Sequence, residues 1–211
     1  MNFETFMALV PKLANSPLPG EESHLKMAPP ERRELMQNID PASFNPRQAA
    51  VLALVFPKGE RAALALIRRN SYKGVHSSQI ALPGGKIERD DASALYAALR
   101  ETEEEIGVDR SLVQLVAPLS PVYIPPSNFS VSPFLAFCER SPVFIPDPRE
   151  VSEIIEMPLE ILLDQSSVQL KRMPTSYSEA IDVPCFAFGP YHIWGATAMM
   201  LSELRDVLKN L

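Results

Sequence analysis

The chain has 211 residues, 46% of them apolar, with a formal net charge of -6 and an isoelectric point near 5.2. This length and apolar content suffice for one globular domain with its own core. The acidic balance argues against a nucleic-acid partner that is held mainly through its phosphates.

The sequence also lacks the usual signals for membranes and secretion. No stretch approaches the roughly 18 consecutive apolar residues of a membrane span, and the first residues lack the basic start of a secretory signal. Cys138 and Cys185 have apolar neighbours and no His or Cys at ligand spacing, which favours buried, reduced thiols. We therefore expect a cytoplasmic protein with no membrane partner.

The N-terminal part of the chain differs in composition from the rest. Apolar residues at helical spacing predict an amphipathic helix in residues 1–15, in which Pro11 is discordant. Residues 16–46 are rich in Pro, Ser, Glu and Asn, and only residues 31–36 have a helical pattern. We interpret residues 1–45 as a helix and connecting arm, which either pairs two copies in a homodimer or covers the active site.

Residues 46–211 form the predicted main domain. Two apolar stretches, residues 49–56 and 62–67, flank a Pro-Lys-Gly-Glu turn and predict a β-hairpin. Further strands are expected at residues 113–117, 131–138, 151–155 and 183–188, and helices at residues 92–106, 158–163 and 194–208. This order predicts an α+β fold, in which helices cover both faces of a mixed sheet.

The predicted helix at residues 92–106 has clear ends and a clear apolar side. Asp90 or Asp91 is the expected N-cap, and Gly107 is the expected left-handed C-terminal cap. The stripe expected to face the core consists of Leu95, Ala98, Leu99, Thr102 and Ile106.

A neighbouring face of this helix carries Glu101, Glu104 and Glu105, whereas Glu103 points to the opposite flank. Like charges at this spacing repel one another, and a divalent cation would remove the conflict. Carboxylate ligands and a phosphate-bearing substrate favour Mg²⁺ or Mn²⁺. Arg100 is expected to fix a carboxylate rotamer. The alternative interpretation of such a run is a solvated helix face.

A glycine segment precedes the helix. Gly84 and Gly85 are expected to let backbone N–H groups approach an anion in the substrate. Arg69 and Lys73 lie just ahead and are candidates for contact with a terminal phosphate, with simple solvation as the alternative. We expect His76 to be a loop residue without a catalytic partner and Trp194 to anchor the core.

Residues 100–108 read Arg-Glu-Thr-Glu-Glu-Glu-Ile-Gly-Val. With Gly85 they resemble the Nudix box, in which Gly, five residues, Glu and seven residues precede Arg-Glu-apolar-x-Glu-Glu-x-Gly-apolar. Here Asp91 replaces the first Glu, and the following gap is one residue longer. The resemblance implies a Nudix-type α/β/α sandwich. It also implies metal ligation by Glu101, Glu104 and Glu105, and it assigns to Asp91 the role of the first Glu of the box.

The longer gap resembles the coenzyme A pyrophosphatase branch of that family. The likeness extends from about Asn45 to Leu204, most clearly at residues 46–52, 150–159 and 193–198. This branch carries a motif ahead of the box that is associated with coenzyme A, and five of its positions differ here. Ile67 stands in place of Thr, Asn70 in place of Ser, Gly74 in place of a basic residue, Ser78 in place of Gly and Leu82 in place of Phe. The branch implies hydrolysis of coenzyme A, or of acyl-coenzyme A, to 3′,5′-ADP and (acyl-)4′-phosphopantetheine.

The expected reaction is attack of a metal-activated water on one phosphorus of a nucleoside diphosphate derivative. Glu101 or Glu105 is the first candidate for the base, and Glu150 is the second. ADP-ribose or another such derivative is an alternative substrate. A sensor of the Nudix fold that binds a nucleotide without cleaving it is an alternative function, against which the intact glutamates and Arg100 argue.

Overall fold

The computed structural model describes residues 1–70, 79–175 and 180–211. Its helices are α1 (Phe3–Leu13), α2 (Glu21–Lys26), α3 (Pro30–Asn38), α4 (Ala94–Ile106), α5 (Leu159–Leu163) and α6 (Gly195–Lys209). Short 3-10 turns are η1 (Pro41–Phe44), η2 (Arg110–Leu112), η3 (Pro125–Ser127) and η4 (Gln165–Ser167). The strands are β1 (Arg47–Lys58), β2 (Arg61–Arg69), β3 (Ile80–Ala81), β4 (Gly84–Lys86), β5 (Gln114–Pro118), β6 (Val122–Ile124), β7 (Phe129–Phe137), β8 (Val151–Pro158), β9 (Val168–Met173), β10 (Ile181–Phe188) and β11 (Tyr191–Trp194).

Strand β1 organises an eight-stranded mixed sheet with the central order β3-β2-β1-β7-β5. One end of β1 forms the predicted hairpin with β2, and the other end pairs antiparallel with β4 at residues 49–51. Strand β7 runs parallel to β1. Strands β6 and β8 extend the sheet, and β9, β10 and β11 form a separate antiparallel sheet. The glycines of β4 are therefore held in the middle of the main sheet.

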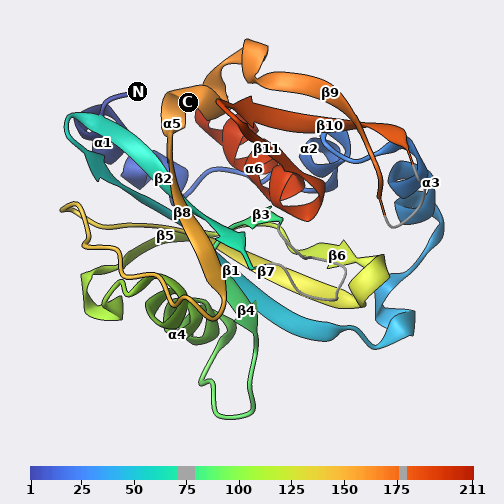
Figure 1. Ribbon diagram of the computed structural model, residues 1–211, viewed down its shortest axis with the longest axis horizontal. Helices are drawn as coiled ribbons and strands as arrows, with labels where there is room; N and C mark the ends of the chain where they lie inside the picture. The colour runs from blue at the N-terminus through green and yellow to red at the C-terminus, as the bar shows by residue number, and fades with distance from the viewer. Residues whose placement is uncertain (71–78, 176–179) are drawn as a thin grey trace.

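Both faces of the main sheet are covered, as Figure 1 shows. Along β1, Ala50, Leu52, Leu54 and Phe56 belong to the core under α4, whereas Ala49, Ala53 and Val55 belong to the core that contains α1, α5 and α6. Alternating side chains of a strand point to opposite faces, so a strand buried on both sides is continuously apolar. The predicted α/β/α sandwich with a mixed sheet is confirmed. Among the described residues, no helix is long and apolar enough to cross a membrane.

The long elements agree with the sequence predictions, and the arm differs from them. Residues 16–46 contain α2, α3 and η1, where the sequence suggested only one or two helical turns. Helices this short are marginal by propensity and depend on tertiary packing. Ser23 and His24 of α2 are buried, and α2 packs against α6. The additional helix thus comes from contact with the domain.

Glu203 of α6 is a buried polar contact between the domain and the arm. Its side chain is buried and accepts the backbone N–H groups of Gly20, at 2.8 Å, and of Ser120, at 2.7 Å. Its Oε2 lies 3.8 Å from Nε2 of His24. Burial opposes ionisation of Glu203, but the contacts with His24 and Ser120 outweigh it and lower its pKa to about 2. The ionised carboxylate therefore stabilises the fold.

We expect Glu203→Gln to lower the free energy of unfolding near neutral pH by roughly 3 kcal/mol. The folded-state pKa of Glu203 lies below the ordinary 4.5, so this contribution is complete above pH 4.5 and is lost as the pH falls toward 2. Urea unfolding at several pH values measures the difference, which should narrow in acid. Glu22→Gln, on the exposed side of α2, is the control and should change stability by less than about 0.5 kcal/mol. An equal effect at pH 3 and pH 7 would contradict this assignment.

Candidate functional site

Helix α4 presents the glutamates, and both of its ends are fixed. Ser93 is the N-cap and its hydroxyl accepts the N–H of Tyr96 at 3.1 Å. The sequence prediction of Asp90 or Asp91 as N-cap is therefore wrong, because the helix begins two residues later and Asp91 binds Arg100 instead. Gly107 ends the helix with a φ of 72°, which confirms the left-handed cap.

The buried side of α4 is rotated relative to the predicted stripe. Ala98, Thr102 and Ile106 are buried as predicted, but Leu95 and Leu99 are only partly buried. Glu105 is buried instead, at 2% exposure of its side chain. The reason is that β4 packs against this edge of the helix. One of the three predicted ligands thus lies inside the protein.

Arg100 holds the two more exposed glutamates. Its Nη1 donates to Glu101 at 3.0 Å and to Glu104 at 2.9 Å. Its Nε and Nη2 donate to the two carboxylate oxygens of Asp91 at 2.9 and 3.0 Å. The hydrogen bond from Arg100 lowers the pKa of Asp91, and this pairing raises the pKa of Arg100. The predicted rotamer-fixing contact is confirmed, and Asp91 holds Arg100 in place.

Glu105 lies under β4, the glycine strand, which begins with Gly84 and Gly85. Its Oε2 accepts the N–H of Gly84 at 2.7 Å, and its Oε1 lies 3.3 Å from Nη2 of Arg69. Burial raises the pKa of Glu105 to about 7, although the charge of Arg69 and the Gly84 hydrogen bond act in the opposite direction. Oε1 is buried without a hydrogen-bond partner. A buried carboxylate oxygen that accepts no hydrogen bond is suited to a divalent cation.

Gly84 and Gly85 make this packing possible. A Cβ built on Gly85 would lie 2.8 Å from Oε1 of Glu101 and still closer to Oε2. Gly84 has a φ of 138°, and a Cβ there would meet the backbone of β1. The anion that accepts the Gly84 N–H is the carboxylate of Glu105, so the N–H does not meet a substrate anion as the sequence suggested.

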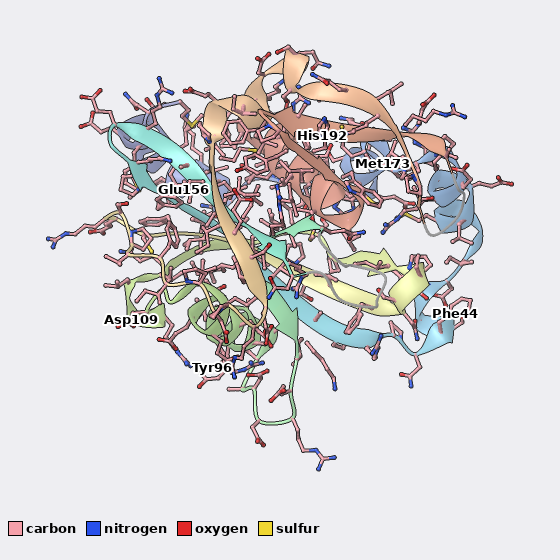
Figure 2. All side chains as sticks on the ribbon, viewed as in Figure 1. Phe44, Tyr96, Asp109, Glu156, Met173 and His192 are labelled. Atoms are coloured by element: carbon pink, nitrogen blue, oxygen red, sulfur yellow. The ribbon has the colours of Figure 1, made fainter. Side chains whose placement is uncertain are left out.

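The opposite flank of α4 is a surface of a different kind. Glu103 accepts a hydrogen bond from Nε of Arg110 at 2.7 Å, and the Arg110 guanidinium lies over the ring of Tyr96. Tyr96 is exposed and projects outward from α4, as Figure 2 shows. The predicted separation of Glu103 from the other glutamates is confirmed.

Glu101, Glu104 and Glu105 are not gathered at ligand distance. Across residues 1–70, 79–175 and 180–211, no group of three or more His, Cys, Asp or Glu side chains has the spacing of a metal site. Two of these glutamates instead share the Arg100 guanidinium, and the third turns toward β4. The donor set still fits a divalent cation, because all its atoms are carboxylate oxygens and Oε1 of Glu105 is buried and accepts no hydrogen bond.

Glu150 lies on the loop before β8. Burial is the main cause that raises the pKa of Glu101 and of Glu105, and the charge of Glu150 acts in the same direction. The loop is held by a 2.8 Å hydrogen bond from the N–H of Asn70 to the Glu150 carbonyl. Glu150 itself is exposed. The fold therefore brings this second candidate base into electrostatic range of the helix, from about 45 residues further along the chain.

Of the two candidates for contact with a terminal phosphate, Arg69 and Lys73, the structure describes only Arg69. Arg69 contacts Glu105 and donates to the carbonyl of Gly84 at 2.8 Å, so it braces the carboxylate and the glycine strand. Part of its side chain also lines the neighbouring cavity. Lys73 lies outside the described residues, as do Gly74, His76 and Ser78.

A cavity of about 290 Å³ adjoins the glycines. Its walls come from β1, β4, β7, helix α3 and the first turn of α6, and its cationic lining residues are Arg32, Arg69 and Lys86. Trp194 is only partly buried and lines this cavity, so the prediction of a core anchor is wrong. Trp194 directly precedes the first turn of α6, which lines the same cavity. Arg32 and Lys86 were missed, and no motif in the sequence marks them.

Comparison with known proteins gives a consistent result. Residues 46–178 match the model of the NUDIX domain. The chain is 37% identical over 175 residues to "Nudix hydrolase 15, mitochondrial" of Arabidopsis thaliana, an alignment that covers 80% of this chain and 61% of that protein. It is 32% identical over 162 residues to "Mitochondrial coenzyme A diphosphatase NUDT8" of Mus musculus, covering 74% of this chain and 75% of that protein.

The solved structure of a Nudix hydrolase from M. smegmatis, RenU, aligns with a TM-score of 0.53 and 18% identity, covering 78% of this chain and 87% of RenU. This likeness shows the shared fold. The chain spans about three fifths of the length of its Arabidopsis relative.

Proposed function

Because this chain belongs to the Nudix hydrolase family, we propose that it hydrolyses the diphosphate bond of a nucleoside diphosphate derivative, with coenzyme A or acyl-coenzyme A as substrate. The products would be 3′,5′-ADP and (acyl-)4′-phosphopantetheine. The observation that carries the proposal is the acidic face of α4, which packs against the glycine strand that lines a cationic cavity. The similarity to the mouse coenzyme A diphosphatase supports this choice of substrate.

Nudix hydrolases generally use divalent metal ions. We propose that Glu101, Glu104 and Glu105 hold Mg²⁺ or Mn²⁺, since hard oxygen ligands and a diphosphate favour these ions. Such an ion supplies Lewis acidity, which lowers the pKa of water and offsets negative charge on the diphosphate.

The neighbouring side chains have distinct tasks in this proposal. Arg100 keeps Glu101 and Glu104 in fixed rotamers, and Arg69 does the same for Glu105. Glu101 or Glu105 accepts the proton of the attacking water, and Glu150 is the second candidate. The raised pKa values of Glu101 and Glu105 support a role in proton transfer, because burial makes these carboxylates more basic.

The test of this function is a substrate panel. The purified chain is incubated with coenzyme A, acetyl-coenzyme A, ADP-ribose or a dinucleoside polyphosphate, with Mg²⁺, Mn²⁺ or EDTA, and products are separated by chromatography. We expect 3′,5′-ADP from coenzyme A with either cation and none with EDTA. Turnover of ADP-ribose without turnover of coenzyme A would refute the substrate. No turnover of any member would refute the reaction.

A further inference from the structure

The described lining of the cavity next to the glycines carries positively charged side chains only. Its described lining contains Arg32, Arg69 and Lys86, and no Asp or Glu. Arg69 already contacts Glu105 at the catalytic end. Figure 1 shows α3, which carries Arg32, at the opposite side of the molecule from α4. Positive charge is therefore present at a second place along the cavity, away from the glutamates.

Arg32 is built into this wall. It is only 4% exposed, and its Nη2 donates to the carbonyl of Tyr123 on β6 at 2.7 Å. This bond holds the guanidinium in one orientation, so little further side-chain entropy is lost when an anion binds. Arg32 also lies outside residues 46–178, the part that matches the domain model. The positive charge that Arg32 brings to the cavity therefore comes from the arm, residues 1–45.

The first turn of α6 lines the same cavity through Gly195, Ala196 and Thr197. The helix has 15 residues, its N-cap provides no side-chain hydrogen bond, and its first turn has no acidic residue. The backbone N–H groups of the first turn and the helix dipole at such an end favour negative charge. The buried guanidinium and the helix end are independent features that select the same kind of ligand group.

We propose that Arg32 is a specificity-determining residue, which binds a second phosphoryl group on the nucleoside half of the substrate, away from the bond that is cleaved. Trp194, which lines the cavity beside the α6 turn, provides an aromatic surface for the base. This inference rests on the proposed function, because it assumes a nucleoside diphosphate substrate. In coenzyme A the group that Arg32 binds is the 3′-phosphate.

The test measures binding without turnover. Calorimetric titration of the full chain with 3′,5′-ADP and with 5′-AMP compares two ligands that differ only in the 3′-phosphate. We expect the wild type to bind 3′,5′-ADP at least ~10-fold more tightly than 5′-AMP, since hydrogen bonds to charged groups are strong. Arg32→Gln should weaken 3′,5′-ADP binding by roughly 10- to 100-fold and leave 5′-AMP binding within about twofold.

Two further variants keep the test decisive. Arg33→Gln changes an exposed arginine one residue along α3 and should bind both ligands as the wild type does. If Arg32→Gln fails to fold, Arg32→Lys retains the charge without the planar fork and should lose a smaller part of the preference. Equal weakening for both ligands, or no weakening in the folded variant, would overturn the proposal.

Steady-state kinetics of the same variant separates the role of Arg32 from the proposed hydrolysis of coenzyme A. In Arg32→Gln we expect a higher KM for coenzyme A, a nearly unchanged kcat, and a KM for dephospho-coenzyme A equal to that of the wild type. An enzyme that never turns over coenzyme A but keeps the Arg32-dependent preference for 3′,5′-ADP would contradict the proposed function alone. Turnover with no such preference would contradict the inference alone.

Discussion

Glu105→Gln is expected to lower kcat for diphosphate hydrolysis by roughly 10³-fold, and Glu104→Gln should have a comparable effect. Glutamine keeps the size of the side chain but removes the negative charge that a divalent cation requires. At position 105 the change also removes the charge that faces Nη2 of Arg69 at 3.3 Å. Steady-state kinetics with coenzyme A over a range of Mg²⁺ and Mn²⁺ concentrations measures the loss.

The variants should remain folded. The pKa of about 7 means that the fold already accommodates the neutral form of Glu105, and the amide oxygen of glutamine can still accept the Gly84 N–H. Glu103→Gln is the matched control on the same helix, since Glu103 pairs with Arg110 on the opposite flank. Its activity should stay within about threefold of the wild type. Full activity of folded Glu105→Gln and Glu104→Gln would show that these side chains hold no cation.

Gly85→Ala is expected to reduce kcat by roughly 10²-fold while the protein stays folded, because small displacements of catalytic groups are costly. The new methyl group would occupy the position of the Glu101 carboxylate. The backbone of Gly85 is not among the positive-φ glycines, so alanine meets no conformational strain there. The flexible end of Glu101 moves more easily than β4, and its contact with Arg100 should be lost.

A double-mutant cycle tests whether the effect passes through Glu101. Glu101→Asp shortens the side chain by one methylene and leaves room for the alanine methyl group. In that background, adding Gly85→Ala should lower kcat by less than about tenfold, which is far below the loss in the wild type. If the loss of kcat in the double variant equals the product of the losses in Gly85→Ala and Glu101→Asp, the contact between Gly85 and Glu101 does not position the carboxylate. Full activity of Gly85→Ala would lead to the same conclusion.

Features set by local backbone geometry were predictable from the sequence. Helix α4 and the separation of Glu103 from the other glutamates follow from the 3.6-residue period. The cap follows from the left-handed conformation that glycine readily adopts at Gly107. The hairpin of β1 and β2 follows from two apolar runs around a turn. The short strands β3, β4 and β6 lack such a pattern, because two or three residues carry no measurable period.

The state of the site residues was decided by the tertiary structure. A helical wheel places Glu105 on the polar face beside the apolar stripe, and only the packing of β4 buries it and raises its pKa. Arg69 reaches the same carboxylate because β1 pairs with both β2 and β4 and thereby brings them together.

The cavity depends on segments far apart in the chain, since Arg32 precedes the first strand and Trp194 precedes the last helix. The sequence by itself determined that three glutamates share one helix face after a pair of glycines, because that spacing is local. Long-range strand pairing and helix packing decided which glutamate is buried, what each arginine contacts, and which distant residues line the cavity, because these contacts join segments with no common period.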